Sequence, residues 1–299
     1  MTWQQLICHT TVEHQEVISG ALEEAGAASV TFEDAVDQPI LEPLPGETPL
    51  WDQLVITGLY PAEDDLTALL LNLELHRGEW GITELKLEQL EDRPWVREWM
   101  DNFHPMQFGK RLWVYPSWRE VPEEATDAVK ILLDPGLAFG TGNHPTTALC
   151  LEWLDGENLT GKTVLDYGCG SGILAIAAAK LGASTIVATD IDPQALEATQ
   201  ENARRNALTE ARIFTCLPED MPDQTFDVVI ANILSGPLVS LAPTILRYLK
   251  PQGRIALSGI LADQGQAVAA AYQNRLEEVQ MAAKEDWLRL EGTAQVSSN

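Results

Sequence analysis

The stretch TVLDYGCGSGILAIAAAKLGA constrains the fold of this chain more than any other part of the sequence. A short apolar run is followed by glycine at every second position, Gly168, Gly170 and Gly172, and then by an alanine-rich run typical of a helix. Such glycines permit a tight turn that brings backbone groups close to a ligand at the helix N-terminus. The pattern is G-x-G-x-G, since Ile173 stands where the dinucleotide-binding pattern G-x-G-x-x-G has its last glycine. The stretch therefore predicts a strand, a ligand-binding turn and a helix.

Two carboxylates accompany this turn. Asp166 lies two residues before the first glycine, where it would oppose a pyrophosphate and would suit a ligand that carries an ammonium group. Asp190 ends the next predicted strand, where a carboxylate can accept both ribose hydroxyls of a nucleoside. The alternative role for Asp190 is to cap the following helix, but Asp192 is better placed to do so, directly before Pro193 at the first helical position. We therefore expect Asp190 to be available to a ligand.

A third polar side chain, Asn232, follows the apolar strand predicted at 228–231. Ligands of open α/β sheets bind at the carboxyl ends of the strands, so Asn232 is expected at the same edge as Asp190. Its amide can both donate and accept hydrogen bonds, and could therefore hold an amine nucleophile or the edge of an adenine. A turn-forming asparagine before a helix is the alternative.

The second part of the chain alternates strands with helices, which predicts a doubly wound α/β sheet. The strands are expected at about 163–167, 185–190, 211–215, 226–231 and 252–259, and the helices at about 173–181, 193–206 and 237–249. A further helix at about 263–272 precedes two short strands, at about 277–283 and 286–291. These two strands could add an antiparallel pair at one edge of the sheet.

The first part of the chain has a different pattern, in the order strand, helix, strand, strand, helix, strand. The strands are expected at about 3–9, 28–32, 53–60 and 82–90, and the helices at about 12–25 and 64–75. Thr10 and Glu13 have the spacing of a capping box for the first helix. This order predicts a ferredoxin-like α+β sandwich.

The two parts of the chain also differ in charge composition. Residues 1–76 contain fourteen acidic side chains and no lysine or arginine, within a chain of net charge −26. Between the two parts lies an aromatic-rich stretch with Trp95, Trp99, Phe103 and Phe108, which is either a packed connector or a hinge that contacts substrate. We expect three regions: a first domain at 1–91, a linker at 92–112 and a second domain at 113–299.

Composition excludes several classes of protein. A strongly acidic chain binds bare nucleic-acid backbones poorly, and no apolar run approaches the roughly 20 residues of a membrane span. The N-terminus has no secretory or organellar leader pattern, so we expect a cytoplasmic protein. The four cysteines and five histidines are dispersed, so neither a metal site nor a disulfide framework is predicted. No heptad or obvious apolar patch calls for a dimer, and we expect a monomer.

The motif DYGCGSG, the Asp190 strand end and Asn232 together resemble the Rossmann-like class I methyltransferases, which depend on S-adenosylmethionine. Upstream, the loop and helix LDPGLAFGTGNHPTTALCLEWL narrows the resemblance to the ribosomal protein methyltransferase A family. In this segment we expect a glycine-rich turn and a helix capped near Thr146 or Thr147. The likeness extends over the whole chain and includes EPLPGE at 42–47, the linker WVREWMDNFHPMQFG and SGIL at 258–261.

This resemblance implies that the chain is an enzyme that transfers methyl groups from S-adenosylmethionine to protein eleven of the large ribosomal subunit, free or assembled. The acceptors would be lysine side chains and the N-terminal α-amine, and S-adenosylhomocysteine would be the second product. The first domain would recognise the protein substrate. The residues implied to contact the methyl donor are Thr147, Gly168, Gly170, Asp190 and Asn232, with Thr147 and the loop at 136–142 closing over it.

The chemistry expected of such a site is mainly positioning, because the sulfonium already activates the methyl group. Asn232 would orient the target amine. No histidine, cysteine or other dedicated base is expected, since desolvation and the nearby sulfonium both favour the neutral amine. Asn143 is assigned no role.

Three other functions remain open. A methyltransferase of the same fold could act on another protein or a small molecule, although a separate first domain suits a macromolecular partner. A non-catalytic ribosome assembly factor could retain a nucleoside pocket. An NAD-dependent oxidoreductase is disfavoured by the glycine spacing. The acidity of the first domain either steers a basic ribosomal protein or serves solubility.

Overall fold

The computed structural model describes residues 3–36, 49–90, 104–121, 128–134 and 144–296. The chain divides into two compact units, Met1–Met100 and Asp101–Asn299. The expected domain boundaries at 91 and 112 stay a prediction, because residues 91–103 lie outside the described part. No helix within the described residues is long and apolar enough to cross a membrane.

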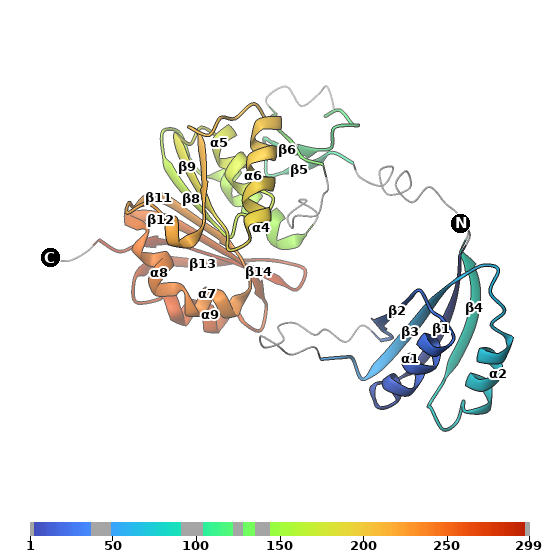
Figure 1. Cartoon of the computed structure of the whole chain (residues 1–299). Helices are drawn as coiled ribbons and strands as arrows, with labels where there is room; N and C mark the ends of the chain where they lie inside the picture. The colour runs from blue at the N-terminus through green and yellow to red at the C-terminus, as the bar shows by residue number, and fades with distance from the viewer. Residues whose placement is uncertain (1–2, 37–48, 91–103, 122–127, 135–143, 297–299) are drawn as a thin grey trace. The chain divides into compact units, whose positions relative to one another are not determined.

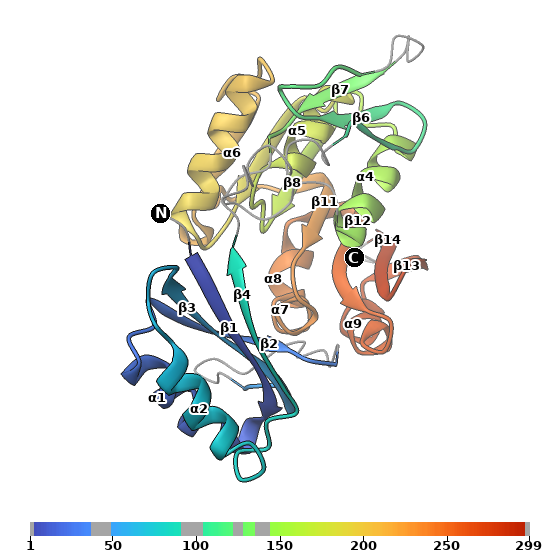
Figure 2. The same ribbon diagram turned by 90° about the vertical axis from the view of Figure 1, so that its right-hand side faces the viewer.

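The first unit is a four-stranded antiparallel sheet in the order β2-β3-β1-β4, with both helices on one face (Figures 1 and 2). Its elements are β1 (Trp3–Thr11), α1 (Gln15–Glu24), β2 (Ser29–Asp34), β3 (Gln53–Pro61), α2 (Thr67–Leu75) and β4 (Glu84–Leu90). Burial alternates along β1, and Leu6 and Cys8 join Ile18 and Leu22 of α1 in one core. The predicted ferredoxin-like order is therefore confirmed.

The expected capping box at the first helix is wrong. Thr10 belongs to β1, and its hydroxyl donates to the Trp80 carbonyl at 2.9 Å. β1 continues to Thr11 because it is paired with β3 along its whole length, and a 3₁₀ turn, Val12–His14, then precedes α1. Pairing in the sheet thus outweighs the local capping preference of the sequence.

The second unit contains a seven-stranded sheet in the order β10-β9-β8-β11-β12-β14-β13. Its strands are β8 (Thr163–Tyr167), β9 (Thr185–Thr189), β10 (Ile213–Cys216), β11 (Phe226–Asn232), β12 (Leu249–Leu261), β13 (Leu276–Lys284) and β14 (Trp287–Ala294). Strands β8 to β12 are parallel, and β14 runs antiparallel to both of its neighbours. The predicted doubly wound sheet with an antiparallel pair at one edge is confirmed.

Helices cover both faces of this sheet (Figure 1). One core contains side chains of α4 (Pro145–Gly156), α5 (Ile173–Lys180) and α6 (Pro193–Arg205), and the other contains those of α7 (Ser235–Ser240), α8 (Ala242–Arg247) and α9 (Gly265–Tyr272). The single helix expected at 237–249 is therefore wrong. Pro243 has no N–H to continue α7, so the chain turns at Leu241 and begins a second short helix.

A small three-stranded sheet, β5 (Met106–Phe108), β6 (Leu112–Tyr115) and β7 (Val129–Leu132), adds to the second unit. Strand β5 falls within the expected linker, yet it pairs with β6 and buries Phe108 in the core that also contains α4 and α5. Strand β5 thus packs with elements of the second unit, while the expected linker at 92–112 stays a prediction. Trp95, Trp99 and Phe103 lie outside the described residues.

A buried carboxylate fastens this small sheet to α4. The side chain of Asp155 is 3% exposed and accepts hydrogen bonds from the backbone N–H of Lys110 at 2.6 Å and of Arg111 at 3.3 Å. The Arg111 guanidinium donates to Asp155 Oδ1 at 3.1 Å and to its carbonyl at 2.8 Å. Four donors thus converge on one residue at the end of α4.

We expect Asp155→Ala to lower the free energy of unfolding by about 1–3 kcal/mol, because it removes the buried acceptor of three hydrogen bonds, one of them from the Arg111 guanidinium. Urea denaturation of the full chain measures this loss. Glu201→Ala is the control, since Glu201 pairs with Arg204 at the surface and should cost less than about 0.5 kcal/mol. Equal losses in the two variants would contradict the role given to Asp155.

Candidate functional site

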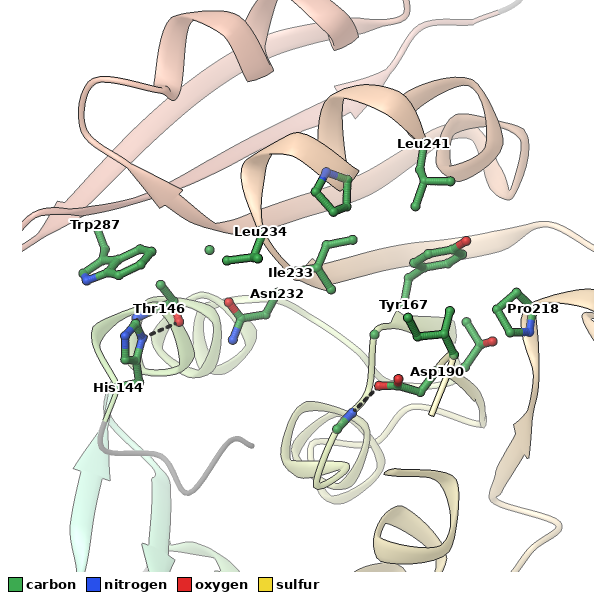
Figure 3. Close-up of a pocket in the computed structure, with 16 residues that line it drawn as sticks. His144, Thr146, Tyr167, Asp190, Pro218, Asn232, Ile233, Leu234, Leu241 and Trp287 are labelled. Atoms are coloured by element: carbon green, nitrogen blue, oxygen red, sulfur yellow. Dashed lines mark hydrogen bonds between the residues drawn. The ribbon is translucent and has the colours of Figure 1, made fainter. Parts of the chain in front are cut away.

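A cavity of about 710 Å³ lies at the carboxyl edge of the seven-stranded sheet (Figure 3). Residues at the ends of β8, β9, β11 and β12 contribute to it, together with residues from α4, α7 and β14. Its described lining is His144, Thr146, Tyr167, Gly168, Gly170, Thr189, Asp190, Ile191, Pro218, Asn232, Ile233, Leu234, Pro237, Leu241, Gly259 and Trp287. The volume is in the range of sites that enclose a small-molecule ligand. Asp190 and Asn232, which the sequence predicts at the carboxyl edge of the sheet, both line this cavity.

Two glycines allow the strand ends to approach one another closely. Gly168 has φ +83°, and a Cβ atom there would lie 2.2 Å from Cγ2 of Ile233. Gly259 has φ +87°, and a Cβ atom there would lie 2.2 Å from the carbonyl oxygen of Ile233. Any larger residue at either position would force the turn after Asn232 away from the glycine loop (168–172).

The amides of the glycine loop are bound by the protein itself. The N–H groups of Gly168 and Cys169 donate to the Thr189 carbonyl at 2.8 and 3.0 Å, and that of Gly170 donates to Asp190 Oδ2 at 2.9 Å. The N–H of Gly172 donates to the Cys169 carbonyl at 2.8 Å. These four donors have protein acceptors, so the loop lacks the row of outward amides that grips a pyrophosphate in dinucleotide sites.

Asp166 lies beneath the same loop and is completely buried. Its Oδ2 atom accepts from the Ala175 N–H at 3.0 Å, so a carboxylate already lies at the N-terminus of α5. Burial, assisted by the nearby Asp190, raises the pKa of Asp166 to about 7. The expectation that Asp166 opposes a pyrophosphate agrees with this position, but Asp166 is not part of the described cavity lining.

Asp190 lines the cavity at the end of β9. Besides the bond from Gly170, its Oδ1 atom accepts from the Asp192 N–H at 3.1 Å, which fixes the carboxylate plane. Each oxygen keeps a further lone pair for a ligand hydroxyl. Asp192 caps α6 by accepting from the Gln194 N–H at 2.9 Å, with Pro193 at the first helical position, as the sequence predicted.

Asn232 lines the cavity at the end of β11, opposite the start of α4 (Figure 3). Its Nδ2 atom donates to Thr147 Oγ1 at 3.3 Å, which orients the amide. Thr147 is completely buried, and Thr146 beside it lines the cavity. The expected contact of Thr147 with the methyl donor stays a prediction.

The expected cap of this helix near Thr146 or Thr147 is wrong, because His144 is the N-cap. The His144 ring accepts from the Thr146 N–H at 3.4 Å, and Pro145 occupies the first helical position. Burial lowers the pKa of His144, partly offset by the charge of Glu285. The imidazole is therefore biased toward its neutral form inside the cavity.

Most of the apolar side chains that line the cavity are not predicted from the sequence. Trp287 comes from β14 and meets the His144 ring edge to face, with 4.8 Å between the ring centres. Ile191 follows Asp190 directly, and its side chain is 84% exposed at the cavity. The position of Ile191, directly after a strand-end aspartate, is a signal available in the sequence, whereas Trp287 belongs to none of the motifs.

Some expected features fall outside the described residues: Gly136, Gly140, Gly142, Asn143 and the loop at 42–47. Among the described residues, no group of three or more histidine, cysteine or acidic side chains could hold a metal ion. Cys8, Cys150, Cys169 and Cys216 are all buried free thiols.

Comparison with known proteins points to one family. The family model described as ribosomal protein L11 methyltransferase (PrmA) matches residues 2–295. Proteins named ribosomal protein L11 methyltransferase from Serratia proteamaculans and Ectopseudomonas mendocina are 55% and 56% identical, with 98% of this chain and 99% of each relative covered. A crystal structure of ribosomal protein L11 methylase from Lactobacillus delbrueckii subsp. bulgaricus is 35% identical, with a TM-score of 0.59 over 65% of this chain and all of that one.

The position of Asp166 leads to a pH-dependent prediction. Its pKa is about 7 in the folded chain and about 3.9 in the unfolded chain, so the folded state binds the proton more tightly between these values. The unfolding free energy should therefore fall as pH rises from about 4 to 7, by up to about 1.4 kcal/mol per pH unit from this group. Asp166→Asn removes that titration, so the stability of the variant relative to the wild type should rise between pH 5 and 8 in urea denaturation.

Asp227→Asn is the matched control. Burial alone would raise the pKa of Asp227, but hydrogen bonds from Thr163 and Lys250 outweigh it and lower the pKa to about 2. Asp227 is thus ionised in both states above pH 5, and its replacement should change stability by an amount independent of pH from 5 to 8. A pH-independent effect of Asp166→Asn as well would show that Asp166 does not titrate as inferred.

Proposed function

The chain belongs to the ribosomal protein L11 methyltransferase family, and we propose that it methylates amino groups of that ribosomal protein with S-adenosylmethionine as the methyl donor. The observation that carries the proposal is a cavity at the carboxyl edge of the sheet, lined by Gly168 and Gly170 of the glycine loop (168–172), by Asp190 and by Asn232. The acceptors are lysine side chains and the N-terminal α-amine, and S-adenosylhomocysteine is the second product. Methylation of a ribosomal protein would take place in the cytoplasm.

The cavity suits S-adenosylmethionine for three reasons. The fixed carboxylate of Asp190 is available to the ribose hydroxyls, and the apolar side chains of Ile191 and Pro218 provide walls for an adenine ring. The glycine loop, through Gly168 and Gly170, offers close backbone approach without a row of free amides, which favours a cationic sulfonium over a pyrophosphate. Thr147 would contact the donor at the start of α4 and would also orient Asn232 through their hydrogen bond.

When bound, S-adenosylmethionine supplies a methyl group already activated by its positive sulfur. Asn232 would hold the acceptor amine: its Nδ2 side is oriented by Thr147, which leaves the amide oxygen to accept an N–H of the amine. The largely apolar cavity walls exclude water and favour the neutral amine, so alignment supplies most of the rate enhancement. His144 and Trp287 line the same space, and their edge-to-face packing limits the room for the acceptor.

We propose that the first unit recognises the protein substrate. Residues 1–76 carry fourteen acidic side chains and no lysine or arginine, whereas ribosomal proteins are basic. Opposite charge accelerates encounter between such partners. This acidity also argues against direct nucleic-acid binding by the first unit.

The alternative functions have less support. An NAD-dependent oxidoreductase would need a pyrophosphate near the N-terminus of α5, where Asp166 already accepts from Ala175. A small-molecule methyltransferase would not need the separate acidic unit. A non-catalytic assembly factor would not need Asn232 held in one orientation beside the donor site.

We expect Asn232→Ala to lower kcat about a hundredfold and to change the Kd for S-adenosylmethionine less than about threefold, because the amide positions the acceptor. Thr147→Val keeps the side-chain shape but removes the acceptor for Asn232, so it should lower kcat about tenfold. Steady-state methylation and calorimetric titration measure the two effects. Equal losses in kcat and donor affinity would assign Asn232 to donor binding alone.

The direct test is methyl transfer from labelled S-adenosylmethionine to purified ribosomal protein L11, followed by intact-mass analysis. Mass gains in steps of one methyl are expected with the full chain and should be absent with Asp190→Ala, which removes the ribose acceptor. Digestion of the product should place the methyl groups on lysines and on the N-terminal amine. A protein that binds S-adenosylmethionine but leaves that substrate unmodified would contradict the proposed specificity.

A further inference from the structure

Helix α6 (Pro193–Arg205) contacts the glycine loop (168–172) through two polar side chains outside the cavity. The hydroxyl of Thr199, a completely buried residue, donates to the Gly170 carbonyl at 3.0 Å. The side-chain amide of Asn202 donates to the Ser171 carbonyl at 2.9 Å. Residues three apart lie on one face of a helix, so both side chains contact the loop from the same side.

The loop has few means of its own to keep its shape. Gly168, Gly170 and Gly172 all have positive φ, at +83°, +53° and +77°, and glycine loses more conformational freedom on ordering than any other residue. On the sheet side, the loop amides are held by the Thr189 carbonyl and by Asp190. On the opposite side, its carbonyl groups are held by α6.

The contact between loop and helix is also close. A Cβ atom at Gly172 would lie 2.7 Å from Cγ2 of Thr199 and 3.0 Å from its Cα, so the loop cannot move toward α6. Neither Thr199 nor Asn202 belongs to the described cavity lining, whereas Gly170 does. Any influence of the two α6 side chains on a ligand must therefore pass through the loop.

We propose that Thr199 and Asn202 are positioning residues that fix the glycine loop in the shape required for S-adenosylmethionine, an inference that rests on the proposed function. A loop ordered before binding spares the ligand the free-energy cost of ordering it. Removal of the Thr199 hydroxyl and the Asn202 amide leaves the hydrogen bonds on the sheet side in place. It leaves the carbonyl groups of Gly170 and Ser171 without these two partners. The effect should appear as weaker donor binding and not as slower transfer from the bound donor.

The same helix offers a matched control. Asn206, the C-cap of α6, is 6% exposed and bonds to β7 through Leu132, accepting from its N–H at 2.9 Å and donating to its carbonyl at 2.7 Å. Asn206 thus resembles Asn202 in chemistry. Its side chain also donates to the Asn202 backbone carbonyl at 2.9 Å, but neither this bond nor those to Leu132 reach the glycine loop. Asn206→Ala should lower the unfolding free energy and leave donor affinity within about twofold of wild type.

The test uses the full chain with Thr199→Val, Thr199→Ser, Asn202→Ala and Asn206→Ala. Calorimetric titration with S-adenosylmethionine should show affinity about five- to tenfold weaker for Thr199→Val and for Asn202→Ala, the loss expected for one hydrogen bond. Thr199→Ser keeps the hydroxyl and should bind within about twofold of wild type. Turnover at saturating donor should stay within about twofold in every variant.

Amide hydrogen exchange without ligand gives a second readout. The segment containing residues 168–176 should exchange faster in Thr199→Val and Asn202→Ala than in wild type, Thr199→Ser or Asn206→Ala. Unchanged exchange and unchanged donor affinity in Thr199→Val would overturn the inference, as would equal loss of affinity in Asn206→Ala. If the wild type binds no S-adenosylmethionine, the proposed function fails, while exchange still reports whether α6 fixes the loop.

Discussion

The close packing of Ile233 between two glycines sets the geometry of the site. Its side chain lies against Gly168 after β8, and its backbone lies against Gly259 in β12. A Cβ atom at either glycine would come within 2.2 Å of Ile233, so the two strand ends and the turn after β11 must be arranged together. Asn232 directly precedes Ile233 in the chain. The distance between Asn232 and the glycine loop is therefore fixed by backbone packing and not by a flexible side chain.

Electrostatics then determine which ligand this arrangement suits. In a phosphate-binding turn, the helix N-terminus and the loop amides point outward as donors. Here the donors are turned inward, toward Asp190, the Thr189 carbonyl and, for α5, the buried Asp166. The site thus offers carboxylate and carbonyl groups near apolar walls, an environment that favours hydroxyl groups and a cation. In the sequence, this difference from phosphate-binding turns is marked by Ile173, which stands where the dinucleotide-binding pattern G-x-G-x-x-G has its last glycine.

Periodicity and the motifs are sufficient to predict the doubly wound sheet and to place Asp190 and Asn232 at its carboxyl edge, because strand ends and glycine turns are encoded locally. The helix cap at His144 is not predicted, because threonine is among the residues favoured at helix N-caps and histidine is not; Pro145 at the first helical position marks where the helix begins. Trp287 could not be predicted, since it reaches the cavity only when β14 inserts between β12 and β13. The burial of Thr147 behind Asn232 likewise depends on how α4 packs on the sheet, which no spacing in the sequence reveals.

The proposed reaction requires a site for the methyl donor and a means to capture the protein substrate, and these two requirements fall on different residues of the chain. Every described residue that lines the cavity lies between His144 and Trp287, within the second unit. The excess of negative charge is greatest in residues 1–76, within the first. Donor binding and transfer need a rigid cavity, whereas capture of a basic protein needs charge that acts over a distance of about a Debye length. Under the proposed division of roles, changes among the acidic residues of 1–76 would alter the capture of the protein substrate, while the packing around Ile233 would keep the transfer geometry unchanged.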